Sequence, residues 1–317
     1  MKIIYGYPNQ KGNVNSVLAF GNFDGIHLGH QSIINAIKNI SVREKITSVV
    51  ITFSPHPAEY LRNKQNFLLL DLKQKIELLQ SYGIDYLYII DFNESFAQLS
   101  PDAFIKDVLV NSCRIKYIVV GHSCFFGHKC LGNIDLLYSY ANIYDYEIVR
   151  IDPIFINDKL CSSSLIREYL SEGKVDLASK ILGRPYQING KVIKGLARGR
   201  VIGFPTVNVD IKHILVPRVG VYSACIKIDD NNVWLNGIVN IGFRPTFNDL
   251  SFPILEMHIF DFDSDIYNQH VAIQLLDFIR PERKFSSIEQ LKQQINEDII
   301  QVKKSLKYIG SKDDEVV

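Results

Sequence analysis

Two hydrophobic patterns follow one another along the chain, and they change near residue 183. In the first half, short apolar runs at residues 17–20, 48–53, 86–91 and 117–120 are separated by stretches whose apolar residues recur every three to four positions, as in residues 72–79. Continuous apolar strands alternating with helices predict a parallel sheet that is covered on both faces. Such a sheet binds its ligands where the carboxyl ends of neighbouring strands meet.

After two short helical stretches at residues 164–173 and 175–182, the apolar residues take a period of two. Residues 220–228, 254–262 and 270–280 each place apolar and polar side chains on opposite faces, and turn-forming residues separate them. Several such strands at short intervals predict a small antiparallel barrel.

A last amphipathic helix follows the barrel. The segment Ser286-Ser-Ile-Glu289 has the spacing of a capping box, which closes a helix N-terminus. A stripe of apolar residues is expected to pack on the barrel, and residues 311–317 are expected to fray. The stripe consists of Ile288, Leu291, Ile295, Ile299, Val302 and Leu306.

We therefore predict an α/β chain of two domains. A Rossmann-like domain with a parallel sheet occupies residues 1–183, and a small antiparallel β-barrel with a C-terminal helix occupies residues 184–317. The length of 317 residues fits this division at ~150 residues per domain.

The charge balance limits the possible partners. The chain has 35 Lys and Arg against 34 Asp and Glu, so its net charge is +1. This excludes a general nucleic-acid or anionic-membrane binder, although a small anion can still be held locally. No apolar run approaches the ~20 residues that cross a bilayer, and no signal peptide is recognisable, so we expect a cytoplasmic protein. The five cysteines form no Cys-x-x-Cys pair, which argues against a disulfide framework or a zinc site.

The first candidate site is the segment Gly21-Asn-Phe-Asp-Gly-Ile-His-Leu-Gly-His30, which follows an apolar strand and opens a helix. Its glycines permit a tight turn and a close approach, and the amide groups of a helix N-terminus favour phosphate. His27 and His30 are expected on one face of the first turn, where imidazoles stabilise charge that develops on phosphoryl oxygens. A single histidine more often caps a helix or lies in a core, but the strand–loop–helix context of this pair favours nucleotide binding.

Two shorter segments add to this site. Residues 162–167, Ser-Ser-Ser-Leu-Ile-Arg, place hydroxyl groups and the guanidinium of Arg167 at another helix start, where they suit a β- or γ-phosphate. His56 lies between two prolines, an arrangement that is more often simple turn chemistry.

The second candidate site begins with an acid-free, glycine-rich run at residues 190–208. It carries four basic residues, which makes it the local anion site that the net charge conceals, and its order differs from that of an ordinary P-loop. Thr206 and Asn208 offer hard oxygen ligands that suit Mg²⁺ beside phosphates. The basic residues are Lys191, Lys194, Arg198 and Arg200.

Glu256 lies among apolar strand residues, where a carboxylate is unfavourable unless it is paired or used. It is suited to take the proton of an alcohol that attacks a γ-phosphate. Taken by itself, Glu256 is more often an ion-pair partner at a barrel mouth, and both interpretations stay open at this point.

Together with the turn Arg244-Pro-Thr-Phe247 and the segment Arg280-Pro-Glu-Arg-Lys-Phe285, these motifs resemble the prokaryotic bifunctional riboflavin kinase/FMN adenylyltransferase (FAD synthetase) family over essentially the whole chain. The resemblance implies a nucleotidyltransferase domain at residues 1–183 and a riboflavin kinase domain at residues 184–317. Riboflavin and ATP then give FMN, and FMN and ATP give FAD and pyrophosphate, both with Mg²⁺. Riboflavin, FMN and ATP are the expected partners.

The resemblance also implies roles for single residues. Glu256 is expected to be the base at the ribityl hydroxyl of riboflavin, and His27, His30 and Arg167 are expected to serve adenylyl transfer. Thr206 and Asn208 are expected to bind Mg²⁺ with ATP. The other residues expected to bind nucleotide or flavin are Gly21, Phe23, Asp24, Gly25, Gly29, Ser162, Ser163, Ser164, Gly195, Arg198, Gly199, Arg200, Gly203, Phe204, Pro205 and Arg280.

One motif departs from the family pattern. The family carries Gly-x-Asp/Asn-Phe-x-Phe-Gly after the fourth strand of its first domain, and this chain has Ser123 and Cys124 at the two changed positions. A shorter polar group and a poorly stacking thiol predict weaker or altered flavin-nucleotide binding, with Phe125 as a replacement for stacking. The alternative function is therefore a riboflavin kinase whose first domain is catalytically weakened or structural. A relationship to aminoacyl-tRNA synthetases is remote, because the chain lacks a Lys-Met-Ser-Lys-Ser loop.

Overall fold

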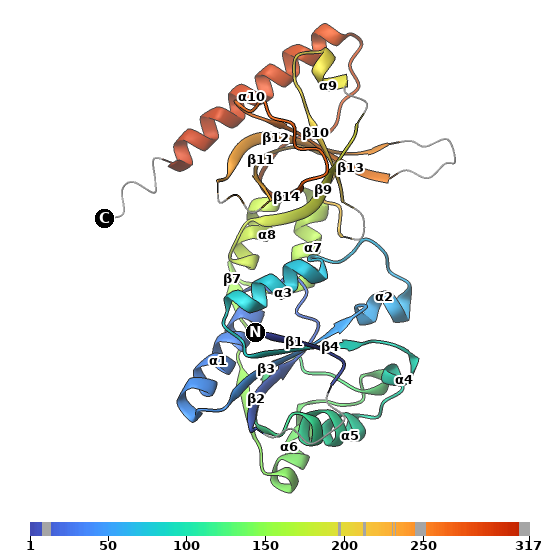
Figure 1. Ribbon diagram of the computed structural model, residues 1–317, viewed down its shortest axis with the longest axis vertical. Helices are drawn as coiled ribbons and strands as arrows, with labels where there is room; N and C mark the ends of the chain where they lie inside the picture. Colours follow the sequence, from blue (N-terminus) through green and yellow to red (C-terminus); the bar gives the residue numbers. More distant parts are fainter. Residues whose placement is uncertain are drawn as a thin grey trace. The chain divides into compact units, whose positions relative to one another are not determined.

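The computed structural model describes residues 1–7, 14–195, 198–211, 214–229, 231, 233–244 and 252–310 (Figure 1). These residues divide into two compact units, Met1–Ser163 and Ser164–Val317. The units divide before residue 183, because helix α8 (Val175–Leu182), which follows α7 (Ser163–Glu172), contacts strands of the second unit. The functional boundary at residue 183 stays a prediction. No helix within the described ranges is long and apolar enough to span a membrane.

The first unit contains the predicted parallel sheet. Six strands lie in the order β1-β4-β3-β2-β5-β6, and every neighbouring pair is parallel. The order changes direction between β2 and β5, and this is the place where sheets of this kind bind ligands. The strands are β1 (Lys2–Tyr5), β2 (Ser16–Phe20), β3 (Thr47–Ser54), β4 (Tyr86–Asp91), β5 (Ile115–Gly121) and β6 (Glu147–Ile151).

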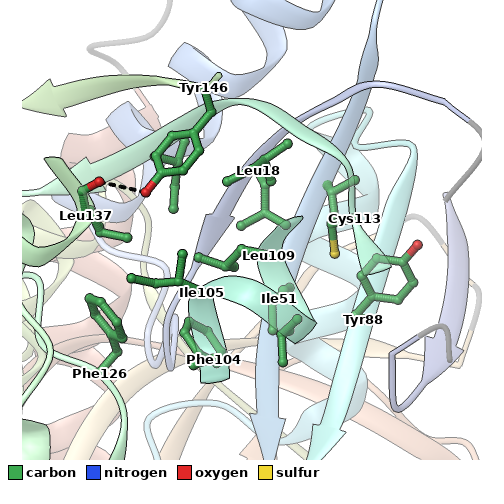
Figure 2. Close-up of a cluster of buried hydrophobic side chains, with 14 of the residues drawn as sticks. Leu18, Ile51, Tyr88, Phe104, Ile105, Leu109, Cys113, Phe126, Leu137 and Tyr146 are labelled. Carbon is green, nitrogen blue, oxygen red and sulfur yellow. Dashed lines mark hydrogen bonds between the residues drawn. The ribbon is translucent and has the colours of Figure 1, made fainter. Parts of the chain in front are cut away.

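Both faces of this sheet are buried. Leu18 and Ile51 face one apolar cluster with the π-helix Phe104–Ser112, and this cluster also holds Tyr146, whose hydroxyl donates to the Leu137 carbonyl at 2.6 Å (Figure 2). The preceding residue on each of these strands, Val17 or Val50, faces the opposite cluster. Burial on both faces explains the continuous apolar runs in the sequence.

Helices and short strands connect the sheet. Helix α1 (Leu28–Glu44) starts directly after the predicted histidine loop, and α3 (Leu72–Ser81) begins one residue after Asp71, whose side chain accepts from the Gln74 amide. The remaining elements of this unit are α2 (Pro57–Arg62), α4 (Glu94–Ala97), α5 (Pro101–Ala103), the 3₁₀ turn His128–Cys130, α6 (Ile134–Tyr144), β7 (Phe155–Ile156) and β8 (Lys159–Leu160).

The second unit contains a closed antiparallel barrel (Figure 1). Its strands lie in the order β10-β13-β12-β11-β14-β9, and β9 pairs again with β10. Tyr222, Ala224 and Ile226 are fully buried, as the period-two pattern predicts. The elements are β9 (Tyr186–Ile193), α9 (Arg198–Val201), β10 (Val207–Asp210), β11 (Gly220–Ile228), β12 (Leu235–Arg244), β13 (Phe252–Ile259), β14 (His270–Arg280) and α10 (Ile288–Gly310).

The start of α10 lies one residue later than the sequence predicts. Ser287 accepts from the Gln290 amide at 3.2 Å, whereas the Ser286 hydroxyl donates to the Gln290 side chain at 2.8 Å. The cap is therefore Ser287, since the helix begins at Ile288 and a capping oxygen accepts from the third helical residue. Of the predicted stripe, Ile299 and Val302 pack on the barrel. The predicted fraying at residues 311–317 lies outside the described residues.

A buried ion pair joins α10 to the barrel. Arg280 Nη2 lies 2.8 Å from Asp298 Oδ2, and Arg280 Nε donates to both carboxylate oxygens at 2.9 and 3.0 Å. The side chains are only 10% and 3% exposed. The guanidinium of Arg280 is therefore held by α10, and the expected role of this residue near a ligand is untested.

We predict that Asp298→Ala lowers the free energy of unfolding of the second unit by about 3–5 kcal/mol, because a buried guanidinium loses its carboxylate. Urea denaturation followed by fluorescence measures this, since Trp234 is the only tryptophan of the chain and lies in the second unit. Glu297→Ala, at the adjacent exposed position of α10, is the control and is expected to change stability by less than about 0.5 kcal/mol. Equal effects of the two substitutions would contradict the prediction.

Candidate active sites

The first candidate site lies at the carboxyl edge of the parallel sheet. The histidine loop directly follows β2, and the loop of residues 122–127 directly follows β5. These two strands are neighbours, with Leu18 paired to Ile118. Both loops therefore leave the sheet at the point where the strand order changes direction.

The turn before α1 has an unusual backbone. Phe23, Gly25 and Ile26 all have positive φ angles, of 46°, 86° and 40°. Such values are rare for a β-branched residue like Ile26, and they persist only where the surroundings hold them. Here both non-glycine side chains are buried in the core, at 2% and 0% exposure. Left-handed residues in a turn orient successive amide groups inward, and this creates a concavity that binds anions.

Hydrogen bonds to the same turn fix its carbonyl groups. The Ser163 hydroxyl donates to the Asp24 carbonyl at 2.7 Å, and Gln31 Nε2 donates to the Ile26 carbonyl at 2.9 Å. The buried Asp24 carboxylate accepts from the Leu69 amide at 3.0 Å. Two predicted residues, Asp24 and Ser163, thus make hydrogen bonds that hold the loop in place.

His27 and His30 stack on each other, with ring centroids 3.7 Å apart and an interplanar angle of 24°. Burial, together with His27 and then Lys75, lowers the pKa of His30 well below its usual value. His30 is therefore neutral at pH 7, and an imidazole that carries one proton donates a single hydrogen bond. Its Nδ1 is buried and has no hydrogen-bond partner within the described residues.

Gly29 is needed for this stacking. A Cβ atom at this position would lie 3.1 Å from His27 Cε1 and 3.2 Å from His27 Nδ1. The sequence predicts a close approach at Gly29, and the structure identifies the approaching group as the His27 ring. A larger residue at this position requires the His27 ring to shift by a few tenths of an ångström.

Lys75 is a site residue that the sequence analysis missed. It is 5% exposed, and its ammonium donates to the Asn22 carbonyl at 2.8 Å and lies 3.4 Å from the Thr52 hydroxyl. Burial lowers its pKa, and the negative charges of Asp24 and Glu59 oppose this. A signal was present, because Lys75 falls on the apolar face of its helix, three residues after Leu72 and four before Leu79.

Other predicted residues are placed less directly. Ser164 and Arg167 belong to the second unit, so their position beside the histidines stays a prediction. His56 caps α2: its ring accepts from the Ala58 amide at 3.0 Å, and its own amide donates to Glu59 at 2.9 Å. The turn interpretation of His56 is therefore confirmed.

The motif at residues 121–127, which differs from the family pattern, contains two phenylalanines with different exposure. Cys124 packs against the core, and burial raises its pKa to about 12, so the thiol stays protonated. Phe126 is 7% exposed, whereas Phe125 is 65% exposed. Phe125 is therefore the aromatic side chain of this segment that lies open to a ligand.

The second candidate site lies on the outer surface of the barrel. Glu256 on β13 pairs with Asn208 on β10 and with Asn240 on β12. Directly opposed residues share a face, with Cβ atoms ~5 Å apart. The flanking residues Leu255 and Met257 are fully buried, so the row of three polar side chains points away from the barrel interior. The cross-strand neighbours of Glu256 are thus amides, and the sequence analysis missed Asn240 because strand register is not readable from one strand.

Two glycines in the described parts of the glycine-rich run lie close to the predicted Mg²⁺ ligands. A Cβ atom at Gly195 would overlap Asn208 Nδ2, and one at Gly199 would lie 3.0 Å from Thr206 Oγ1. Of the two predicted Mg²⁺ ligands, Asn208 lies in β10 and Thr206 directly precedes this strand. Each of them is close to a glycine of the run. Two hard oxygen donors in this position fit a divalent cation beside phosphates.

The end of this run is held by the barrel. The Phe204 amide donates to the Gly199 carbonyl at 2.8 Å, and the Pro205 carbonyl lies 2.8 Å from His258 Nδ1. Gly203 has a φ of 92°, which permits the turn between α9 and β10. Arg198 and Arg200 both lie in α9. The predicted turn Arg244-Pro-Thr-Phe247 lies outside the described residues beyond the Arg244 backbone.

We predict that acid destabilises the first unit through His30. Because the pKa of His30 is lowered in the folded state, the unfolded chain binds a proton that the folded chain does not as the pH falls below 6.5. This single group then removes up to about 1.4 kcal/mol of stability per pH unit. Urea denaturation followed by circular dichroism, between about pH 7.5 and about pH 5.5, measures the loss.

His30→Gln is expected to remove this part of the pH dependence. His122→Gln, at an exposed position of the same unit, is the matched control and is expected to keep the wild-type dependence. A His30→Gln chain with the same pH dependence as the wild type would show that His30 is not held neutral by the fold.

Comparison with known proteins gives a different family match for each half of the chain. A family model for FAD synthetase matches residues 9–165, and one for riboflavin kinase matches residues 182–306. A bifunctional riboflavin kinase/FMN adenylyltransferase of Buchnera aphidicola is 40% identical over 96% of this chain and 98% of its own length. The protein with the same description from Bacillus subtilis is 39% identical over 89% of this chain and 90% of its own.

A solved structure is similar over the same length. The crystal structure described as a macrolide-efflux protein from Streptococcus pneumoniae has a TM-score of 0.85 and 30% sequence identity, and the match covers 96% of this chain and 99% of that one. The parallel sheet of the first unit and the barrel of the second are thus folds found in a protein known from experiment.

Proposed function

The chain belongs to the bifunctional riboflavin kinase/FMN adenylyltransferase family, and we propose that each unit carries out one of the two reactions. The second unit phosphorylates riboflavin to FMN with ATP, and the first unit adenylylates FMN to FAD with release of pyrophosphate. The observation that carries this proposal is that the histidine loop and the glycine-rich run lie in separate compact units. A cytoplasmic location, where ATP is available, goes with the proposal.

In adenylyl transfer, a phosphate oxygen of FMN attacks the α-phosphorus of ATP, and the bond to the β-phosphate breaks to release pyrophosphate. The protein's task is to position both phosphates and to stabilise the charge on the oxygens. The stacked, neutral His30 supports this role, because it donates a hydrogen bond without requiring protonation first. The turn at residues 21–25 and Gly29 receives the phosphates, and Ser162, Ser163, Ser164 and Arg167 bind the leaving pyrophosphate.

In the kinase reaction, the terminal ribityl hydroxyl of riboflavin attacks the γ-phosphorus, and ADP leaves. Glu256 accepts the hydroxyl proton, and its position opposite Asn208 supports this role because it puts the carboxylate next to the proposed phosphate site. The loop over this site holds the ATP phosphates through Gly195, Arg198, Gly199, Arg200, Gly203, Phe204 and Pro205. Arg280 contributes by holding α10, through its pair with Asp298.

Thr206 and Asn208 would hold Mg²⁺ in the kinase site. Their oxygen donors and the close cover by Gly195 and Gly199 fit a cation that is bound together with a nucleotide. When bound, Mg²⁺ neutralises negative charge on the transferred phosphoryl group.

The product assay tests the proposal directly. Purified chain is incubated with riboflavin, ATP and Mg²⁺, and FMN and FAD are separated by chromatography. We expect both products. FMN without FAD would support the alternative of a kinase with a structural first unit, and neither product would overturn both activities.

Two variants assign the reactions to the two units. Glu256→Gln removes the proposed base, and we expect FMN formation to fall at least ~100-fold while FAD formation from added FMN continues. The double variant His27→Ala, His30→Ala is expected to abolish FAD formation and to leave FMN formation intact. Loss of the same product in both variants would contradict the assignment.

We predict that Phe125 has taken over flavin stacking in the altered motif. Because stacking of a base on an aromatic ring is worth about 1–3 kcal/mol, Phe125→Ala is expected to raise the KM for FMN about tenfold in FAD formation. Leu131→Ala, which changes another exposed apolar residue nearby in the sequence, is the control. An unchanged KM for FMN in Phe125→Ala would show that the flavin lies elsewhere.

A further inference from the structure

The buried Lys75 is not used by either proposed reaction, although it lies in the first unit directly beneath the phosphate-binding turn. Its ammonium group donates to the carbonyl of Asn22 at 2.8 Å. The Thr52 hydroxyl donates to the same carbonyl at 3.2 Å. Two donors from two different elements, α3 and β3, thus converge on one peptide group of the turn.

This contact fixes the direction of the next amide group. In a trans peptide the C=O and N–H bonds point in opposite directions. With the Asn22 carbonyl held toward Lys75 and Thr52, the amide of Phe23 has to point away from these two side chains. Phe23 is also the first of the residues with positive φ in this turn. The hydrogen bonds from Lys75 and Thr52 to the Asn22 carbonyl are therefore made where the left-handed part of the turn begins.

Burial of the Lys75 ammonium is costly to the fold, which indicates a purpose other than stability. A lysine ammonium loses its hydration when it is buried, and Lys75 is only 5% exposed. The lowered pKa of Lys75 expresses the same cost, since the folded state disfavours the charged form. A residue that serves packing alone would be apolar at this position, as Leu79 is one turn later on the same helix.

The same charge acts on His30. The groups that influence the protonation of His30 are His27 from its own segment and Lys75 from α3. Asp24 from the turn and Glu59 from α2 act in turn on Lys75. The Lys75 charge disfavours a second charge on His30, so it helps to keep the imidazole neutral.

We propose that Lys75 is a positioning residue of the adenylyl-transfer site: it orients the phosphate-binding turn through the Asn22 carbonyl, and its positive charge acts electrostatically on His30. The inference rests on the proposed function of the first unit and assigns no direct contact with the nucleotide. It explains why a charged residue interrupts the apolar face of α3 beneath a turn of left-handed residues.

Lys75→Met tests the inference in the full-length chain, because methionine keeps the length of the side chain and removes the charge and the donors. Misplacement of reacting groups by about 1 Å lowers rates about 100-fold, so we expect a loss of this size in kcat/KM for ATP during FAD formation. FMN formation by the second unit is expected to stay unchanged and reports the amount of intact enzyme. The control is Lys73→Met, two residues earlier on the same helix, with a side chain that is 72% exposed.

Two further readouts separate positioning from a structural role. The melting temperature of Lys75→Met is expected to equal or exceed that of the wild type, since the buried charge is removed. In an NMR titration of the histidine side chains, the pKa of His30 is expected to rise. A merely structural lysine predicts the opposite: a lower melting temperature and an unchanged His30.

Thr52→Val provides the second variant. It removes the other donor to Asn22 and keeps the Lys75 charge, so we expect a fall in FAD formation of about tenfold with no change at His30. If Lys75→Met does not give a folded chain, Thr52→Val tests the inference by itself. FAD formation within twofold of the wild type in the folded variants would overturn the inference, whereas a wild type that makes no FAD would instead overturn the proposed function.

Discussion

Complete burial of the apolar strand positions decides where both candidate sites lie. In the first unit both faces of the parallel sheet are covered, and the histidine loop and the loop after β5 lie where their strands end. In the barrel the interior is filled by residues such as Tyr222 and Met257, and the polar row around Glu256 faces outward. Each proposed phosphate site thus lies at the surface that the core of its unit leaves available.

The two sites meet the same chemical need in different ways. The first contains a turn of left-handed residues, a stacked histidine pair and a buried lysine that holds the Asn22 carbonyl of the turn. The second uses a glycine-rich loop that closes over Thr206 and Asn208. In the first, burial disfavours charge on the His30 imidazole; in the second, the predicted phosphate-binding residues Arg198 and Arg200 lie on a short helix.

Local patterns predicted much of this structure. The strands at residues 86–91, 220–228 and 270–280 and the helix at residues 175–182 have the predicted bounds, because apolar periodicity and a following glycine are local signals. The cap of α10 was misplaced by one residue, since Ser286 and Ser287 offer the same hydroxyl and only the backbone selects one. The family resemblance was confirmed by relatives that match nearly the whole chain.

The sequence by itself determined the two patterns of strands, the histidine and glycine-rich motifs, and the family. Only the tertiary structure decided which residues meet: Asn240 joins Glu256 through strand register, Arg280 is paired with Asp298, and Lys75 reaches Asn22 across 53 positions of the chain. The physical reason is the distance along the chain over which each interaction acts. Periodicity, capping and turn chemistry act over a few residues, whereas register and the pairing of buried charges arise only when distant segments are packed together.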